Sequence, residues 1–132
     1  MYQWYKKGDD LIGNSIEAQL KTIIAEKIIK SIKNNDFEII DRSKNKVFMR
    51  RYRLNHSSIK KILLSLDYSS VCKIDEDRHK EEFGQKPIII LKTKKELINF
   101  HGEPEEVTIY IKLKLLEDRV IPIISFHEAE FW

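Results

Sequence analysis

The sequence predicts an α+β fold, in which helices pack on one face of an antiparallel sheet. Apolar residues recur at helical spacing between Ile16 and Ile32. Apolar and polar residues alternate strictly over 107–115, a pattern typical of a half-buried strand. The segments also follow the order helix, strands, helix, strands. This order favours helices gathered on one side of a sheet over a βαβ arrangement.

The composition indicates one small globular domain. The chain of 132 residues corresponds to a single domain, which we place at 14–132 after an N-terminal arm of residues 1–13. The longest wholly apolar run, Ile88 to Leu91, is far too short to cross a membrane. The start of the chain lacks the apolar core of a signal peptide. The only cysteine, Cys72, cannot form an internal disulfide, so we expect a cytoplasmic protein.

The first half of the chain predicts two helices separated by short strands. A helix over 15–33 follows Asn14 and Glu17, which have the spacing of a capping box, and it ends at Asn34-Asn35-Asp36. Two strand-like runs, 37–40 and 47–49, flank a polar step and predict a hairpin or a strand–loop–strand unit. Capping residues at 55–58 predict a second helix that ends near Asp67.

The second half predicts strands joined by loops. Residues 68–74 fit either a strand or a loop, and the charged stretch 75–85 reads as a surface loop. Ile88 to Leu91 predicts a buried strand. Gly102 and Pro104 favour a loop over 93–106, with a helical turn near 96–100 as an option. Strands over 107–116 and 119–127 should pair around a turn at Glu117-Asp118, their apolar face against the first helix.

The last two predicted strands bring polar side chains together. A two-residue turn places Tyr110 opposite Ser125, and a turn longer by two residues places it opposite His127. In both registers Tyr110, Lys112, Ser125 and His127 share one face. A phenol, an ammonium, a hydroxyl and an imidazole can supply the acid, base and cation for metal-free cleavage of an RNA phosphodiester. The alternative is a set of ordinary sheet residues whose lysines keep the strand soluble.

Charge is unevenly distributed although the net charge is only +3. One stretch without acids holds six basic residues, namely Arg42, Lys44, Lys46, Arg50, Arg51 and Arg53. Five acids fall between Asp75 and Glu82. The basic stretch suits a polyanion such as RNA, and the alternative is a solvated surface. The four histidines lack cysteine partners at ligand spacing and no Gly-rich phosphate loop is present, so the sequence predicts neither a metal site nor a cofactor.

Two C-terminal segments resemble a family of bacterial toxins. Ile109-Tyr110-Ile111-Lys112-Leu113-Lys114-Leu115 and Ile123-Ile124-Ser125-Phe126-His127-Glu128-Ala129-Glu130 are similar to the "YIKLKL … ISFHEAE" ending of MqsR-like toxins. Upstream, Arg42-Ser43-Lys44-Asn45 and Ile62-Leu63-Leu64-Ser65-Leu66-Asp67-Tyr68 look like the "R-x-K-N" and "L-x-L-x-x-x-D-Y" steps of that family. The resemblance covers roughly residues 20–130.

The resemblance implies a RelE-like ribonuclease fold and a toxin of a type II toxin–antitoxin system. Such a toxin is a ribosome-independent endoribonuclease that acts on mRNA, and a cognate antitoxin protein holds it inactive. By position, Tyr110 matches the active-site tyrosine, His127 lies where a basic residue closes the site, and Lys73 loosely matches a family lysine. With Lys112, these are the expected catalytic residues. The alternative is a non-catalytic RNA- or protein-binding module of the same fold.

Overall fold

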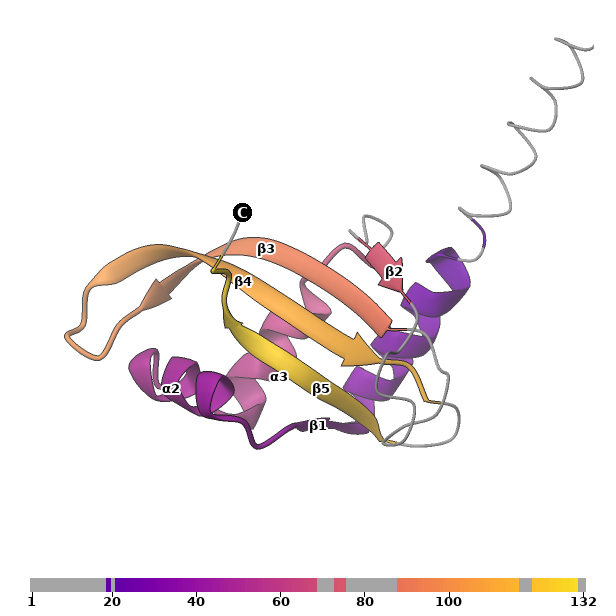
Figure 1. Ribbon diagram of the computed structural model, residues 1–132, viewed down its shortest axis with the longest axis horizontal. Helices are drawn as coiled ribbons and strands as arrows, with labels where there is room; N and C mark the ends of the chain where they lie inside the picture. The colour runs from indigo at the N-terminus through magenta and orange to yellow at the C-terminus, as the bar shows by residue number, and fades with distance from the viewer. Residues whose placement is uncertain (1–18, 20, 69–72, 76–87, 117–119, 131–132) are drawn as a thin grey trace, which may run out of the picture.

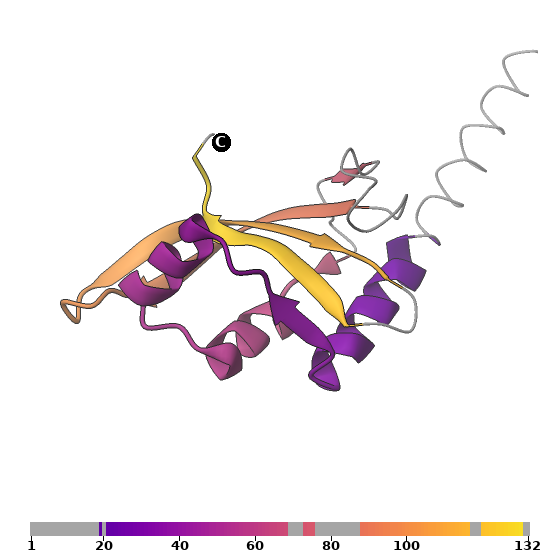
Figure 2. The ribbon, with the colours of Figure 1, turned by 60° about the horizontal axis from the view of Figure 1, so that its bottom comes forward.

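The computed structural model describes residues 19, 21–68, 73–75, 88–116 and 120–130. In these ranges five strands form one sheet with the order β1-β5-β4-β3-β2 (Figure 1). The strands are β1 (Phe37–Ile39), β2 (Lys73–Asp75), β3 (Ile88–Ile98), β4 (Pro104–Lys114) and β5 (Ile121–Glu128). The helices are a first helix described over 21–33, α2 (Ser43–Arg51) and α3 (His56–Leu64). They lie on one face of the sheet, which confirms the predicted α+β class (Figure 2).

The sheet is mixed at one edge. β2, β3, β4 and β5 pair antiparallel in turn, as expected. β1 pairs parallel with β5, and Phe37 lies opposite Ile121. The sequence did not predict this parallel pair, because no helix connects the two strands directly and they are far apart in the chain.

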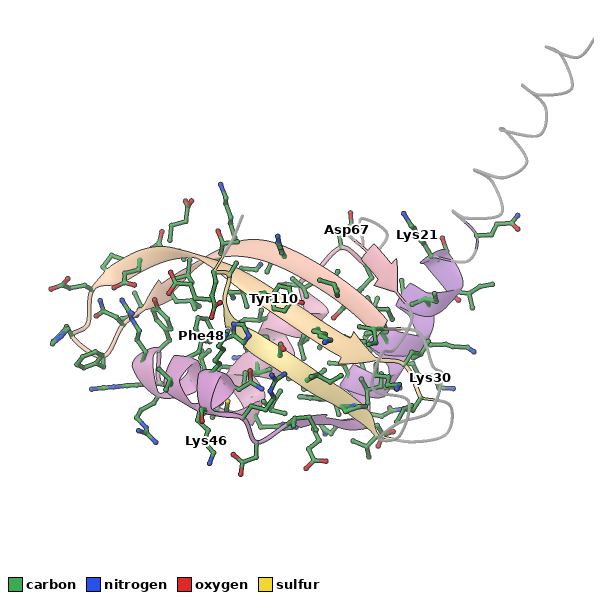
Figure 3. The ribbon with its side chains drawn as sticks, in the orientation of Figure 1. Lys21, Lys30, Lys46, Phe48, Asp67 and Tyr110 are labelled. Carbon is green, nitrogen blue, oxygen red and sulfur yellow. The ribbon has the colours of Figure 1, made fainter. Side chains whose placement is uncertain are left out.

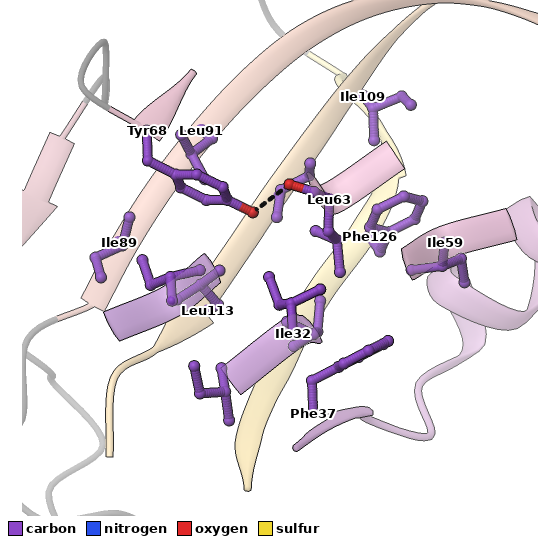
Figure 4. Close-up of a cluster of buried hydrophobic side chains, with 14 of the residues drawn as sticks. Ile32, Phe37, Ile59, Leu63, Tyr68, Ile89, Leu91, Ile109, Leu113 and Phe126 are labelled. Carbon is purple, nitrogen blue, oxygen red and sulfur yellow. Dashed lines mark hydrogen bonds between the residues drawn. The ribbon is translucent and has the colours of Figure 1, made fainter. Parts of the chain in front are cut away.

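The core fills the space between the helices and the facing side of the sheet (Figure 4). Ile109, Ile111 and Leu113 are fully buried there with Ile28 and Ile32 of the first helix, as the alternating pattern predicted. The buried Tyr68 donates a 2.8 Å hydrogen bond from its hydroxyl to the Leu63 carbonyl (Figure 4). This bond satisfies the one polar atom that the ring brings into the core, and burial raises the pKa of Tyr68.

The described part of the first helix and the start of α3 lie where the sequence placed them, but α3 ends at Leu64 rather than near Asp67. The first helix ends at Lys33, and Asn35 takes a left-handed conformation with φ of 62°. α3 begins after Asn55, whose side chain accepts a 2.8 Å bond from the Ser58 amide while the Ser58 hydroxyl accepts from the Asn55 amide. This reciprocal pair is the capping box that gives α3 its sharp start.

The prediction of a strand at 47–49 is wrong, because these residues belong to helix α2. The inward side chains Asn45, Phe48, Met49 and Tyr52 are spaced i, i+3, i+4 and i+7, which is a helical period. The three consecutive apolar residues at 47–49 fit a strand as well as a helix, so the helical period was not recognised. The polar flanks of this run also read as turns rather than as the exposed side of a helix.

The prediction of a loop over 93–106 is also wrong. β3 and β4 are each eleven residues long and pair from Ile88 opposite Lys114 to Ile98 opposite Pro104. A short turn joins them, in which the Asn99 side chain accepts bonds from the amides of His101 and Glu103 and Gly102 takes φ of 83°. Gly102 and Pro104 therefore mark a hairpin turn and the first residue of a strand, a position where proline removes no ladder bond.

Several predictions fall outside the described residues. These are the arm 1–13, Cys72, the loop from residue 76 onward, and the turn at Glu117-Asp118. Within the described ranges no helix has the length and apolar character needed to span a membrane.

Candidate nucleic-acid interface

Tyr110 and His127 lie directly opposite each other on neighbouring strands β4 and β5. This is the register that the longer turn predicted. Their ring centroids are 5.5 Å apart and both side chains are half-buried. Tyr110 lies on the face of the sheet that the helices leave uncovered (Figure 3). One phosphodiester group can therefore contact the phenol and the imidazole together.

A β-bulge in β5 turns His127 to this face. Lys112 pairs with Ser125 and Leu113 pairs with Ile123, so Ile124 has no partner on β4. Before the bulge Ile121 and Ile123 point into the core, and after it Phe126 does. An unbroken alternation would send residue 127 to the core side with Ile121 and Ile123. The extra residue is what reconciles the buried isoleucines with an outward His127.

The side chain of Asn45 holds the bulge in place. Its amide nitrogen donates 3.0 Å bonds to the carbonyls of Ile40 and Ile124, and its oxygen accepts a 2.9 Å bond from the Phe126 amide. Asn45 is only 1% exposed. The Arg42 guanidinium adds bonds of 3.4 Å to the Ile124 carbonyl and 3.3 Å to the Ser125 hydroxyl. The start of α2 thus fixes the geometry of β5 beside His127.

The hydrogen bond at His127 defines its tautomer. Nδ1 lies 2.9 Å from the carbonyl oxygen of Glu128. A carbonyl can only accept, so Nδ1 carries the proton in the neutral ring. Nε2 then holds the lone pair and can take a proton from a substrate, or return one when the ring is charged.

Lysines occupy positions next to the Tyr110–His127 pair on the neighbouring strand β3 and farther along β4. Lys92 of β3 lies opposite Tyr110, so Lys92, Tyr110 and His127 form one cross-strand row. Lys112 and Ser125 belong to the next row, and the backbone of Lys73 joins that row through Ile90. Three of the four expected catalytic residues therefore share one region of the sheet, and Lys73 is near it in register. Ser125 is 3% exposed, so its hydroxyl serves Arg42 rather than a ligand.

Sequence reasoning missed Lys92 because its strand was expected to end at Leu91. The apolar residues Ile89, Leu91 and Leu97 do recur at odd positions, with lysine between them at residues 92 and 94. This alternation was the available signal, but Thr93 and Lys95 interrupt it on the core side.

A groove of about 540 Å³ lies where α2 meets the end of β5. One wall is formed by Lys44, Val47, Phe48 and Arg51, and the other by residues 127–130. The four α2 residues are spaced i, i+3, i+4 and i+7, so they lie on one side of the helix. Figure 3 shows Phe48 where α2 approaches the sheet. Since His127 lines the groove and also contacts Tyr110, the groove is continuous with the outward face of the sheet.

The six basic residues predicted to bind RNA do not form a single patch. Lys44 and Arg51 line the groove, and Arg42 lies beside Ser125. The other three have different surroundings. Lys46 pairs with Asp41 at 2.6 Å, Arg53 donates to the Phe100 carbonyl, and Arg50 is exposed on the side of α2 shared by Lys46.

Carboxylates also bind two of the groove cations. Lys44 pairs with Glu130 at 2.5 Å, and this hydrogen bond lowers the pKa of Glu130, with a smaller contribution from the charge of His127. Arg51 lies 3.5 Å from Glu105. Glu105 also accepts a 2.6 Å bond from the Tyr52 hydroxyl and a 2.8 Å bond from the Asn99 amide. These contacts attach the end of α2 to the β3–β4 hairpin.

Within the described ranges no group of three or more His, Cys, Asp or Glu side chains is placed to hold a metal ion. No protein-family model matches this sequence, and neither the curated proteins nor the solved structures contain a significant match. The function must therefore be inferred from the residues and their geometry.

Proposed function

We propose that this protein is the toxin of a type II toxin–antitoxin system, an endoribonuclease that cleaves mRNA in the cytoplasm without the ribosome and without a metal. The observation that carries the proposal is the Tyr110–His127 pair, with ring centroids 5.5 Å apart and with Lys92 and Lys112 in the adjoining register positions. The resemblance of residues 109–115 and 123–130 to MqsR-like toxins, whose fold is RelE-like, supports it.

The proposed reaction uses the 2′-hydroxyl of RNA as the nucleophile. Nε2 of His127 removes the proton from the 2′-hydroxyl, the 2′-oxygen forms a bond to phosphorus, and the bond from phosphorus to the 5′-oxygen breaks. Tyr110 donates a proton to the leaving 5′-oxygen. Lys112 and Arg42 stabilise the negative charge that grows on the phosphoryl oxygens, and Lys73 contributes to this stabilisation. The products carry a 2′,3′-cyclic phosphate and a 5′-hydroxyl.

An enzyme of this kind must be silenced in the cell that makes it, so the proposal includes a cognate antitoxin protein. Charge complementarity gives the acidic segment from Asp75 to Glu82 as a docking site for a basic part of that protein. Co-purification with the product of the neighbouring gene is the result we expect. Full yield of the protein alone, with no toxicity, would count against an antitoxin.

A second candidate function is a non-catalytic RNA- or protein-binding module. The observation that favours it is that Lys44, Lys46 and Arg51 each already pair with a carboxylate of the same chain. Cations that are already paired with carboxylates of the same chain attract RNA less strongly, which suits a modest-affinity binding face.

Expression from a tightly controlled promoter separates the two functions. The enzyme should stop growth and deplete full-length mRNA, while the His127→Ala variant at equal protein level should do neither. Harmless expression of the wild-type chain would favour the binding module. Growth arrest by both chains, with mRNA intact, would exclude cleavage as the cause.

A further inference from the structure

We propose that the groove between α2 and the end of β5 binds one nucleotide of the RNA, with its base against Val47 and its phosphate toward Lys44 and Arg51. The inference rests on the proposed function for the identity of the polymer. It adds a binding site on α2 that adjoins the reacting pair on the sheet and shares His127 with it.

The accessible apolar residue of the groove is Val47, and Phe48 beneath it is largely buried. Val47 is 62% exposed although it is a valine on a well-formed helix, so its side chain faces the groove rather than the core. Phe48 is held from behind by an edge-on contact with Phe126 at 6.0 Å. The groove volume of about 540 Å³ falls within the roughly 300–1,000 Å³ of small-ligand sites. A flat, largely apolar ring such as a nucleobase can bury the exposed Val47 side chain on this surface.

The groove lining carries two cations, Lys44 and Arg51, and two carboxylates, Glu128 and Glu130. Lys44 and Arg51 lie two turns apart on the same face of α2, with Val47 and Phe48 between them. The Lys44–Glu130 pair is solvent-exposed, with 59% and 52% of the two side chains accessible. Exposed ion pairs contribute little stability, so a phosphate can replace Glu130 at the lysine. An exposed apolar side chain beside a lysine whose ion pair is solvent-exposed suits a nucleotide better than a wholly apolar peptide.

The groove lies where a nucleotide next to the scissile phosphodiester would be bound. His127 lines the groove and touches Tyr110, so the two sites share one residue. A strand whose phosphate lies at Tyr110 therefore passes directly into the groove. The base bound there belongs to a nucleotide next to the scissile bond.

Binding of an uncleavable oligonucleotide tests this inference apart from catalysis. The probe is a fluorescein-labelled 2′-O-methyl octanucleotide of mixed sequence, which lacks the attacking hydroxyl. We expect Val47→Asp to weaken its binding about tenfold or more, because the apolar contact between the base and Val47 is lost. Val120→Asp is the matched control, since Val120 is a 48% exposed valine at the opposite end of β5. Equal affinities of the two variants would overturn the inference, as would a wild-type chain that does not bind the probe.

An abasic probe of the same length provides a second measurement that needs no variant. Wild type should bind it more weakly by about the factor that Val47→Asp loses on the intact probe, and Val47→Asp should bind both probes alike. If the intact and abasic probes bind wild type equally, the groove holds no base. If the protein still cleaves RNA in that case, the proposed base site is contradicted and the proposed ribonuclease function is not. If binding depends on the base but ordinary RNA is not cleaved, the ribonuclease function is contradicted and the base site is not.

Discussion

The side-chain amide of Asn45 takes the place of a neighbouring strand beside β5. β1 ends at Ile39, and the bond from the Ile40 amide to the Ile123 carbonyl is the last backbone hydrogen bond described between this segment and β5. From there the Asn45 amide binds the Ile124 carbonyl and the Phe126 amide. A buried side chain with both a donor and an acceptor in one plane is needed, and asparagine supplies it.

We predict that Asn45→Ala lowers the free energy of unfolding by about 2–4 kcal/mol. The substitution removes the Asn45 acceptor from the buried Phe126 amide and the Asn45 donor from the carbonyls of Ile40 and Ile124, of which Ile124 keeps the 3.4 Å bond from Arg42. Each buried group that loses its partner costs about 1–3 kcal/mol. Urea unfolding measures the loss, and Asn34→Ala, at an exposed asparagine, should stay within about 0.5 kcal/mol of wild type. If both variants unfold at the wild-type urea concentration, Asn45 does not hold the bulge.

At the scale of elements, α2 is attached to the β3–β4 hairpin by the Tyr52–Glu105 hydrogen bond of 2.6 Å. Burial, followed by this bond, raises the pKa of Tyr52 to about 12. The bond from Tyr52, then that from Asn99 and the charge of Arg51, lowers the pKa of Glu105 below its ordinary value of 4.5. A lowered carboxyl pKa means that Glu105 adds stability above its unfolded-state pKa. That stability is lost as pH falls through the folded-state pKa.

We therefore predict that Glu105→Gln reduces the acid sensitivity of the fold. Between about pH 7 and pH 3 the wild type should lose more thermal stability than the variant, because only the wild type must protonate a stabilised carboxylate. Thermal melts at both pH values provide the measurement. Glu106→Gln, at the next and exposed position of β4, should follow the wild-type curve. Parallel curves for all three chains would contradict a role for Glu105.

The two sides of α2 should contribute differently to RNA binding. Lys44 faces the groove and Lys46 does not, although each forms one exposed ion pair, with Glu130 and Asp41 respectively. We predict that Lys44→Gln weakens RNA binding several-fold and lowers the slope of log affinity against log salt by about 0.7 to 1. Lys46→Gln should change both much less. Titrations at several salt concentrations test this, and equal effects would place the RNA elsewhere.

Some elements could be predicted from the sequence because their signal is local. The alternation over β4 gave its inward residues, and the Asn55–Ser58 spacing gave the start of α3. α2 was missed because a run of three apolar residues, Val47 to Met49, has the same appearance in a strand and a helix. The length of β3 was missed because Thr93 and Lys95 interrupt the apolar alternation on the core side of the strand.

At the scale of the whole molecule, the strand period and register predicted that Tyr110 and His127 share a face. They did not predict the β-bulge that makes this possible. The bulge at Ile124 depends on Asn45 and Arg42, which are about 80 residues away in the chain and have no local signature. The same holds for the parallel β1–β5 pair and for the groove, whose walls come from α2 and from the end of β5. Tertiary contacts of this kind decide which predicted residues meet.

The most direct test of the proposed function is the rate at which purified protein cleaves naked RNA in EDTA. We predict cleavage by wild type, products with 2′,3′-cyclic phosphate ends, and rates about 10²–10⁴-fold lower for His127→Ala and Tyr110→Phe. His101→Ala, at an exposed histidine of the hairpin turn, should cleave at the wild-type rate. Wild-type activity in a His127→Ala protein that is folded by circular dichroism, or loss of wild-type activity in EDTA, would contradict the proposed mechanism.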